Sequence, residues 1–259
     1  MSKELALSGI ERQSQLRDFI AQMQRVSVEQ ICEQFAISTA TARRDLEVLA
    51  KGGKIQRIHG GAIIAYSAPP EPPLTLRSTE QADEKRRIGQ AAAALVNDGD
   101  TVFLGSGTTV LEVANHLRSR VNLTVITNSL LVMNALAGTP SIQLVSVGGV
   151  LRESELSFIG HITEQALREL RANKVFMGIR AIDPQHGLTN DYLPETQTDR
   201  VILNIGHEVI IVADHTKCER VSTTFVAPIN AIHRLITDTR TSDEFVSAVS
   251  ARGVHVMTV

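Results

Sequence analysis

From residue 84 to the end of the chain, short apolar runs alternate with longer segments of helical spacing, and this alternation constrains the fold most strongly. Runs of strand length occur at 101–104, 123–126, 142–147, 175–177, 209–213, 235–237 and 254–258. Helical patterns occupy 84–96, 110–117, 130–137, 163–170, 193–205 and 242–251. A helix between successive strands makes the strands parallel and covers both faces of their sheet. We therefore expect a C-terminal α/β domain with a mainly parallel sheet.

The first 50 residues show a different pattern, with three closely spaced helical segments. Ser27 begins the second of them, and Gln30 stands three residues later, which is the spacing of a capping box. Only Ala36 and Ile37 separate Phe35 from the third helix, which begins at Ser38. The side chains expected to face inward are Leu16, Ile20 and Met23, with Ile10 and Phe19 beside them, then Val28, Ile31 and Phe35, and then Ala42, Leu46 and Leu49. Such a compact three-helix unit contains the tight turn of a helix-turn-helix.

The third helix and the segment after it are locally basic. Residues 38–62 contain five Lys or Arg and two acids, a net charge of +3, whereas the whole chain has −2. The run 54–59 alternates apolar and polar residues between glycine pairs, as the wing of a winged helix-turn-helix does. A basic helix can also be an ordinary solvated surface, but its position here favours contact with double-stranded DNA. The residues expected to contact DNA are Ser38, Thr39, Thr41, Arg43, Arg44, Lys54, Arg57 and His59.

A proline-rich segment marks the boundary between these two patterns. Four of the eight prolines fall within residues 67–73, and such a run favours stiff, extended backbone. We expect a winged helix-turn-helix domain at 1–65, a linker at 66–80 and a larger domain at 81–259. A surface loop is the alternative interpretation of the proline run.

The bulk composition excludes several other classes. No run of about 18 apolar residues is present, and the N-terminal residues lack the apolar core of a signal peptide, so we expect a cytoplasmic protein with no membrane partner. Cys32 and Cys218 stand alone, and the histidines lack ligand spacing, so no metal and no cofactor is predicted.

Polar residues follow several of the expected strands. Gly105, Ser106, Gly107, Thr108 and Thr109 lie between a strand and a helix, where backbone amides and hydroxyls can hold an anion. Other candidates at strand ends are Asn128, Gly149, Arg180, Asp214 and Lys217. Taken singly, residues 105–109 could be a tight turn, Asn128 a helix cap, and Asp214 with Lys217 a local ion pair. Because the carboxyl ends of parallel strands share one edge of the sheet, together they predict a ligand pocket.

Taken together, these patterns resemble the DeoR family of bacterial transcriptional regulators. The N-terminal resemblance rests on Ser38, Thr41, Arg43-Arg44-Asp45-Leu46, Leu49, Gly53, Arg57 and His59-Gly60-Gly61-Ala62. The C-terminal resemblance rests on Glu84-Lys85, Asp98-Gly99-Asp100, Gly107-Thr108-Thr109, Thr127-Asn128-Ser129, Gly148-Gly149, Gly160, Gly187-Leu188-Thr189, Asp214 and Lys217.

The resemblance implies a homo-oligomeric repressor, dimer or tetramer, of a carbohydrate catabolic operon. It implies an effector domain with the fold of ribose-5-phosphate isomerase, and release from operator DNA when a phosphorylated sugar binds. Gly105, Asn173 and Arg180-Ala181 depart from the family pattern, and we expect all of them near the effector site. The rival interpretation is an enzyme, a sugar-phosphate isomerase or deaminase with an appended DNA-binding domain. It rests on the same anion cradle and on Asp214 with Lys217 as an acid–base pair, but no base–nucleophile spacing accompanies them.

Overall fold

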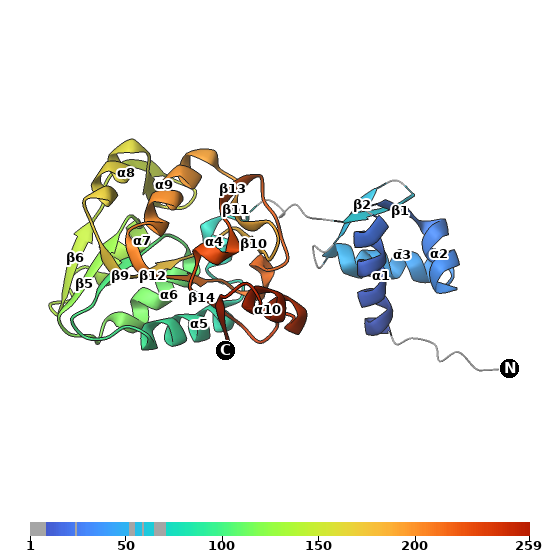
Figure 1. Ribbon diagram of the computed structural model, residues 1–259, viewed down its shortest axis with the longest axis horizontal. Coiled ribbons are helices and arrows are strands. Elements are labelled where there is room, and N and C mark those ends of the chain that lie inside the picture. The colour runs from blue at the N-terminus through green and yellow to red at the C-terminus, as the bar shows by residue number, and fades with distance from the viewer. Residues whose placement is uncertain (1–8, 24, 52–54, 59, 65–70) are drawn as a thin grey trace. The chain divides into compact units, whose positions relative to one another are not determined.

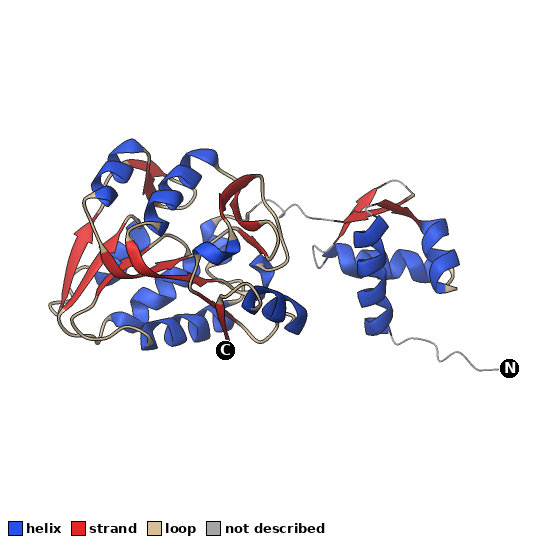
Figure 2. Ribbon diagram, in the orientation of Figure 1, coloured by secondary structure: helices blue, strands red, loops and turns tan. Residues whose placement is uncertain are grey.

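The computed structural model describes residues 9–23, 25–51, 55–58, 60–64 and 71–259, which form two compact units, 1–69 and 70–259. Figure 1 labels the elements along the chain, and Figure 2 shows a first unit made chiefly of helices and a second that mixes helices and strands. No described helix is long and apolar enough to cross a membrane.

The first unit consists of three helices and a small antiparallel sheet. Its elements are α1 (Gly9–Met23), β1 (Arg25–Ser27), α2 (Val28–Phe35), α3 (Thr39–Lys51), β2 (Ile55–Ile58) and β3 (Gly61–Ile64), and the sheet order is β1-β3-β2. The capping box at the start of α2 is confirmed, because Ser27 accepts from the Gln30 amide and the Gln30 side chain accepts from the Ser27 amide. The predicted winged helix-turn-helix is therefore present.

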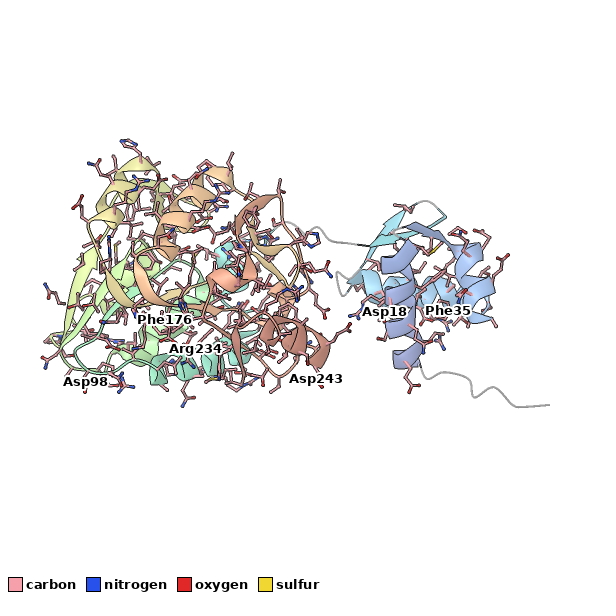
Figure 3. The ribbon with its side chains drawn as sticks, viewed as in Figure 1. Asp18, Phe35, Asp98, Phe176, Arg234 and Asp243 are labelled. Carbon is pink, nitrogen blue, oxygen red and sulfur yellow. The ribbon has the colours of Figure 1, made fainter. Side chains whose placement is uncertain are left out.

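The core of the first unit agrees with the helical spacing except at one end of α1. The buried side chains are Leu16, Ile20, Val26, Val28, Ile31, Ala42, Leu46, Leu49, Ile55 and Ala62. Phe35, labelled in Figure 3, packs edge-on against Phe19 with ring centroids 5.7 Å apart. The prediction for Met23 was wrong: Met23 ends α1 and is 49% exposed, while Val26 of β1 supplies the next apolar side chain of the core. The side chain of Ile10 lies outside the described residues.

The second unit is built on a seven-stranded sheet in the order β15-β14-β12-β9-β4-β5-β6. Every neighbouring pair in this sheet is parallel. Its strands are β4 (Thr101–Leu104), β5 (Leu123–Thr127), β6 (Ile142–Ser146), β9 (Ala172–Met177), β12 (Gly206–Val212), β14 (Arg234–Thr237) and β15 (His255–Thr258). Its helices are α4 (Leu74–Arg77), α5 (Ala82–Ala94), α6 (Thr108–Leu117), α7 (Leu130–Leu136), α8 (His161–Arg168), α9 (Leu193–Leu203) and α10 (Asp243–Ser250). The predicted α/β fold with a parallel sheet is confirmed.

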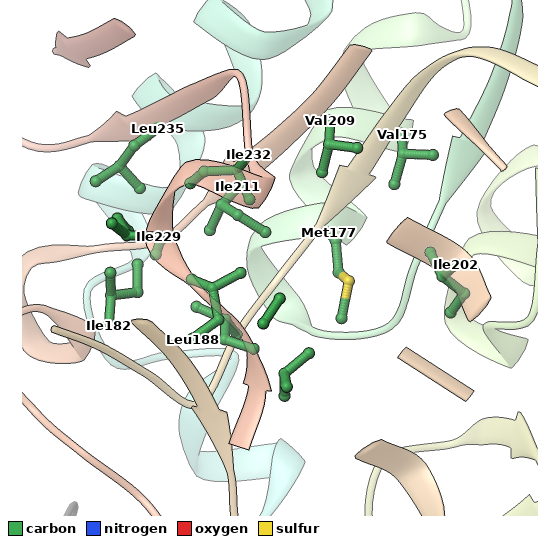
Figure 4. Close-up of a cluster of buried hydrophobic side chains, with 14 of the residues drawn as sticks. Val175, Met177, Ile182, Leu188, Ile202, Val209, Ile211, Ile229, Ile232 and Leu235 are labelled. Atoms are coloured by element: carbon green, nitrogen blue, oxygen red, sulfur yellow. The ribbon is translucent and has the colours of Figure 1, made fainter. Parts of the chain in front are cut away.

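Side chains alternate between two cores along the strands, one on each face of the sheet. On one face, Leu104 and Phe176 pack with residues of α5, α6 and α7. On the other face, Val175 and Met177 pack with residues of α8, α9 and α10, and Figure 4 shows part of this cluster. Burial on both faces explains why these strands are continuous apolar runs in the sequence.

The strand order reverses between β4 and β9. From β4 the sheet continues through β5 to β6, whereas from β9 it continues through β12 and β14 to β15. In open parallel sheets, such a reversal leaves a crevice beyond the carboxyl ends of the two central strands. The loops after β4 and β9 therefore occupy the position where a ligand is expected.

Five short strands of the second unit were not predicted. They are β7 (Val150–Arg152) and β8 (Ser157–Ile159), which form a hairpin, and β10 (Ala181–Asp183), β11 (Gly187–Asn190) and β13 (Thr224–Ala227), which form an antiparallel sheet. These strands are three or four residues long. A run of that length carries too little alternation for its period to be recognised.

Part of the segment expected to be a linker is packed into the second unit. The expected linker covered residues 66–80, but Arg77 of α4 is buried and its guanidinium binds the carboxylate of Glu155, with both oxygens 2.7 Å from Nη2. Glu71 also contacts Arg77, with 3.2 Å between Oε1 and Nη1. Residues 71–80 are thus part of the folded second unit.

Candidate functional site

The N-terminal half of α3 presents polar side chains to solvent. Thr39, Arg43 and Arg44 are exposed. The Ser38 hydroxyl accepts from the Thr41 amide at 3.2 Å and lies 2.9 Å from the Thr41 hydroxyl, so it caps the start of the helix. The two arginines are therefore held on a capped, rigid helix, with their guanidinium groups accessible to a partner.

The opposite face of α3 contains a buried ion pair that the sequence did not reveal. Asp45 accepts from Arg12 of α1 at 2.7 Å and from the Gln13 side chain at 2.9 Å. Burial alone would raise the pKa of Asp45, but the hydrogen bonds from Arg12 and Gln13 outweigh it and lower this pKa. Asp45 thus fixes α1 against α3. Because its charge is paired with Arg12, it does not reduce the positive charge of the exposed face that carries Arg43 and Arg44.

The hairpin after α3 has the geometry of a wing. Strands β2 and β3 pair antiparallel, and the Arg57 side chain on β2 is exposed. Gly61 pairs with Ser27 of β1, and a Cβ at this position would lie 2.1 Å from the Val26 carbonyl oxygen. Glycine is therefore required where the wing packs on β1. The other two predicted wing contacts, Lys54 and His59, lie outside the described residues.

The loop after β4 joins a strand to a helix, as its sequence predicted, and it lies where the strand order reverses. The Gly105 amide donates to the Phe176 carbonyl of β9 at 2.9 Å, which joins this loop to the neighbouring strand. Gly107 has a positive φ of 106° and precedes α6 without a side-chain cap. Thr108 and Thr109 begin α6 and are each 9% exposed. The first backbone amides of a helix have no intrahelical acceptor, so they can bind an anion here.

Two further predicted residues lie at the next strand ends, and the structure gives both a packing role. The Asn128 side chain donates to the Phe158 carbonyl of β8 at 2.9 Å, while its Oδ1 is buried and has no hydrogen-bond partner in the part of the chain that the structure describes. Gly149 has a φ of 154°, and a Cβ there would lie 2.0 Å from the Thr163 hydroxyl. Asn128 therefore offers an acceptor to a ligand, whereas Gly149 is explained by its close contact with α8.

Arg180, which follows β9, is buried and belongs to a group of charged side chains. Its side chain is 5% exposed and lies 3.4 Å from Oε1 of Glu71 and 3.5 Å from Oδ2 of Asp191. Lys217, which ends the short 3₁₀ helix η1 (His215–Lys217) after β12, binds the same oxygen of Glu71. Arg180 and Lys217 thus come together as predicted, but around a carboxylate from the segment that the sequence assigned to the linker.

Asp214 does not pair with Lys217 in the way the local ion-pair interpretation required. Its carboxylate accepts from the Thr216 amide at 2.9 Å and from the Thr216 hydroxyl, which caps η1. Lys85 of α5 lies near Asp214. Burial lowers the pKa of Lys85, and the negative charge of Asp214 opposes that effect. The Lys85 ammonium donates to the carbonyls of Arg77 and Glu80 and so holds the segment after α4.

A cavity of about 620 Å³ adjoins this charged group. Its lining residues are Glu71, Pro72, Pro73, Leu74, Thr75, Arg152, Glu153, Ser154, Glu155, Leu156 and Asp191. Glu71 and Asp191, which line the cavity, are also the ion-pair partners of Arg180, so the cavity lies beside this charged group. Its volume is within the range of small-molecule sites. Among the described residues, no three His, Cys, Asp or Glu side chains are grouped to hold a metal ion.

Two buried carboxylates on α9 lie next to the same cavity wall. Glu195 binds Arg152 and accepts from the Ser157 hydroxyl, and Asp199 accepts from the Asn190 side chain. Burial raises the pKa of Glu195 to about 7, although the charge of Arg152 opposes it. Burial and the charge of Glu195 raise the pKa of Asp199 well above its usual range.

These raised pKa values predict how the stability of the second unit depends on pH. Because the folded state binds a proton at these carboxyl groups more tightly than the unfolded chain does, protonation stabilises the fold. This stabilisation is complete below the ordinary carboxyl pKa of about 4.3 and is lost as pH rises through about 7. We expect the free energy of unfolding to fall by roughly 2 kcal/mol between about pH 5 and pH 8. Thermal unfolding across this range should show a flatter dependence for Glu195→Gln. An equally steep dependence in that variant would contradict the assignment.

One expected member of the site lies elsewhere. Asn173 was predicted near the effector site, but it follows the first residue of β9, and its Oδ1 accepts from the Thr101 amide at the start of β4 at 2.7 Å. Because β4 and β9 are parallel, Asn173 lies at the amino edge of the sheet, opposite the loops that follow the strands. Asn173 therefore lies away from the loops where the ligand is expected.

Comparison with known proteins agrees with both units. Residues 12–68 match the DeoR-like helix-turn-helix domain, and residues 80–239 match the DeoR C terminal sensor domain. The chain is 34% identical to the transcriptional repressor AccR of Agrobacterium fabrum over 89% of this chain and 90% of AccR. It is 33% identical to the HTH-type transcriptional repressor GlcR of Bacillus subtilis over 95% of each chain. It is also 32% identical to the glycerol-3-phosphate regulon repressor of Escherichia coli over 88% of this chain and 90% of that protein.

Solved structures similar to the chain include ribose 5-phosphate isomerase A from Methanocaldococcus jannaschii, with a TM-score of 0.40, 20% identity, and coverage of 54% of this chain and 55% of that one.

The relatives above are named as repressors, which confirms the prediction of a regulator and not an enzyme. Two family models together match most of the chain, and the fold and the exposed basic helix agree with them. The chain therefore belongs to the DeoR family of DNA-binding transcriptional repressors, with an N-terminal helix-turn-helix unit and a C-terminal sensor domain.

Proposed function

We propose that the protein represses a carbohydrate catabolic operon and releases its operator when a phosphorylated sugar binds at the carboxyl edge of the sheet. The observation that carries the proposal is that Arg180, after β9, and Lys217, after β12, meet at Glu71, while the uncapped start of α6 follows the neighbouring strand β4. Guanidinium, ammonium and helix amides together suit a phosphate group. One relative is named for the regulon of glycerol 3-phosphate, which is itself a small phosphorylated polyol.

Apart from Gly149, each predicted effector residue has a defined task in this proposal. The phosphate binds the amides and hydroxyls of residues 105–109, while Arg180 and Lys217 neutralise its charge. The unpartnered Oδ1 of Asn128 accepts from a sugar hydroxyl, and Asp214 orients the loop that carries Lys217. The cavity bordered by Asp191 and Arg152 has room for the carbon chain of the sugar.

On the operator, Arg43, Arg44 and Thr41 contact bases and phosphates in the major groove, and Lys54, Arg57 and His59 of the wing contact the flanking backbone or minor groove. Association of two or four chains through their sensor domains then presents several α3 helices to a repeated or palindromic site. A ligand that shifts the protein to a form with about 1–3 kcal/mol weaker operator binding is sufficient for release.

A thermal-shift screen tests the ligand class. At a concentration of about 100 Kd, a bound ligand stabilises the folded state by about 2.7 kcal/mol, which raises the Tm of a domain of this size by roughly 5–10 °C. We expect at least one of glucose 6-phosphate, ribose 5-phosphate and glycerol 3-phosphate to give such a shift in the wild-type protein. Lys217→Ala should reduce the shift, whereas Lys51→Ala on α3 should not. An equal shift in all three proteins would reject the proposed site.

A further inference from the structure

The carboxylate of Glu71 stands among three cations at the predicted ligand site. Its Oε1 lies 3.2 Å from Arg77 and 3.4 Å from Arg180, and it also binds Lys217. Burial would raise the pKa of Glu71, but the charges of Lys217 and Arg77 outweigh it and lower this pKa. Glu71 is therefore an anion at neutral pH, and it neutralises two of the cations that the proposed ligand requires.

Glu71 is not the only residue that holds α4 in place. Arg77 already binds both carboxylate oxygens of Glu155 at 2.7 Å, and its backbone carbonyl accepts from Lys85. Among the described residues, the buried Nε of Arg180 has no hydrogen-bond partner, as is also true of Arg77, so Glu71 and Asp191 leave the donors of Arg180 incompletely used. An anion with more acceptor oxygens would satisfy Arg180 better than Glu71 does.

We propose that Glu71 occupies the anion position of the sensor site and that the phosphate group of the ligand displaces it from Arg180 and Lys217. This inference rests on the proposed function. A phosphate ester carries a charge of about −1.5 to −2 and three acceptor oxygens, whereas a carboxylate carries −1 and two oxygens. The same two cations therefore bind a phosphate more strongly than they bind Glu71. A neutral sugar cannot make this exchange, which restricts the ligand class to anionic compounds.

The exchange also supplies a connection to the DNA-binding unit. Ile64 ends β3 in the first unit, and the chain reaches Glu71 through residues 65–70. Glu71 is the first described residue of the second unit. A ligand can shift an equilibrium only if it interacts differently with the two states, and competition with Glu71 provides that difference. The position of the Glu71 carboxylate thus couples ligand binding to the segment that leads to the DNA-binding unit.

The substitution Glu71→Gln tests the competition, because glutamine keeps the shape of the side chain and removes its charge. We expect the probe that shifts the wild-type Tm to bind Glu71→Gln at least about tenfold more tightly in calorimetric titration, since no anion has to be displaced. Glu153→Gln is the matched control, because Glu153 lines the same cavity and is exposed. The control should keep the wild-type affinity. Inorganic phosphate, titrated in parallel, shows whether the phosphate group alone is sufficient.

A second measurement follows the displaced segment. The amides of Leu76 and Arg77 both donate to the Pro73 carbonyl at 3.0 Å, so their hydrogen exchange reports the order of the turn that follows Glu71. The probe should accelerate this exchange in the wild-type protein, and Glu71→Gln should exchange faster without any probe. Operator binding by Glu71→Gln should respond less to the probe than operator binding by the wild type.

The outcomes separate the inference from the proposed function. If the wild type binds a probe and Glu71→Gln binds it equally or more weakly, the competition is rejected and the proposed function remains. An equal gain in Glu71→Gln and Glu153→Gln would also reject it, because the effect would then be a general change of charge. If neither the wild type nor Glu71→Gln binds any probe, both the proposed function and the inference are rejected.

Discussion

Replacing Arg43 and Arg44 together with alanine is expected to abolish specific operator binding while the first unit stays folded. Both side chains are exposed on α3, next to the start capped by Ser38. An arginine that contacts a guanine edge contributes about 1–3 kcal/mol of discrimination, and one that contacts phosphate contributes to affinity for every sequence. The double variant should therefore lose at least about 100-fold in affinity. Electrophoretic mobility shift or fluorescence anisotropy with operator DNA measures the loss.

The matched control is the double variant Arg86→Ala and Arg87→Ala on α5. These two arginines are also adjacent and exposed, and Arg86 makes a surface ion pair with Asp83 at 3.0 Å. The control removes the same charge from the second unit, so it separates local contacts from the effect of net charge. The Tm of both variants should stay close to that of the wild type. If the α3 variant still bound the operator specifically, the assignment of α3 as the recognition helix would be contradicted.

The second large effect is expected from Arg77→Ala, which should destabilise the second unit by about 3–5 kcal/mol. Arg77 is buried, and its loss leaves the carboxylate of Glu155 buried without its cation. Breaking a buried ion pair from one side costs this amount because the remaining charge stays in a poorly solvated position. With about 2–4 °C per kcal/mol for a domain of this size, the Tm should fall by at least roughly 6 °C.

A double-mutant cycle checks that the cost arises from the pair. Removing Arg77 and Glu155 together should cost less than the sum of the single substitutions, since no unpaired buried charge remains. Arg86→Ala, which breaks a solvent-exposed pair, should change stability by less than about 0.5 kcal/mol. Additive effects of Arg77→Ala and Glu155→Ala would show that the two side chains do not stabilise each other.

The regular parts of the fold could be predicted from the sequence because their patterns are local. The capping box of Ser27 and Gln30 needs only a three-residue spacing, and the parallel sheet follows from apolar runs buried on both faces. The burial of Leu46 and Leu49 on α3 likewise follows from helical periodicity. The exposure of Met23 did not follow, because the position where α1 leaves the core depends on the neighbouring β1.

The candidate site was only partly predictable, because some of its members meet across large distances in the sequence. Glu71 contacts Lys217, and Arg77 contacts Glu155, yet Glu71 and Arg77 both come from the segment 66–80 that was expected to be a linker. A glutamate between prolines carries no local sign that it will be buried among cations. The buried pair of Arg12 and Asp45 was missed for the same reason, since charged side chains at these positions are ordinarily solvated.

Operator titration of the full-length wild-type protein, with and without the sugar phosphate selected by thermal shift, tests the central claim most directly. The account predicts that the saturating ligand weakens operator affinity by about tenfold or more, equivalent to a coupling of about 1.4 kcal/mol. By reciprocity, operator DNA should weaken binding of the sugar phosphate by the same factor. An operator affinity that stays unchanged at saturating ligand would contradict the claim that the carboxyl edge of the sheet controls DNA binding.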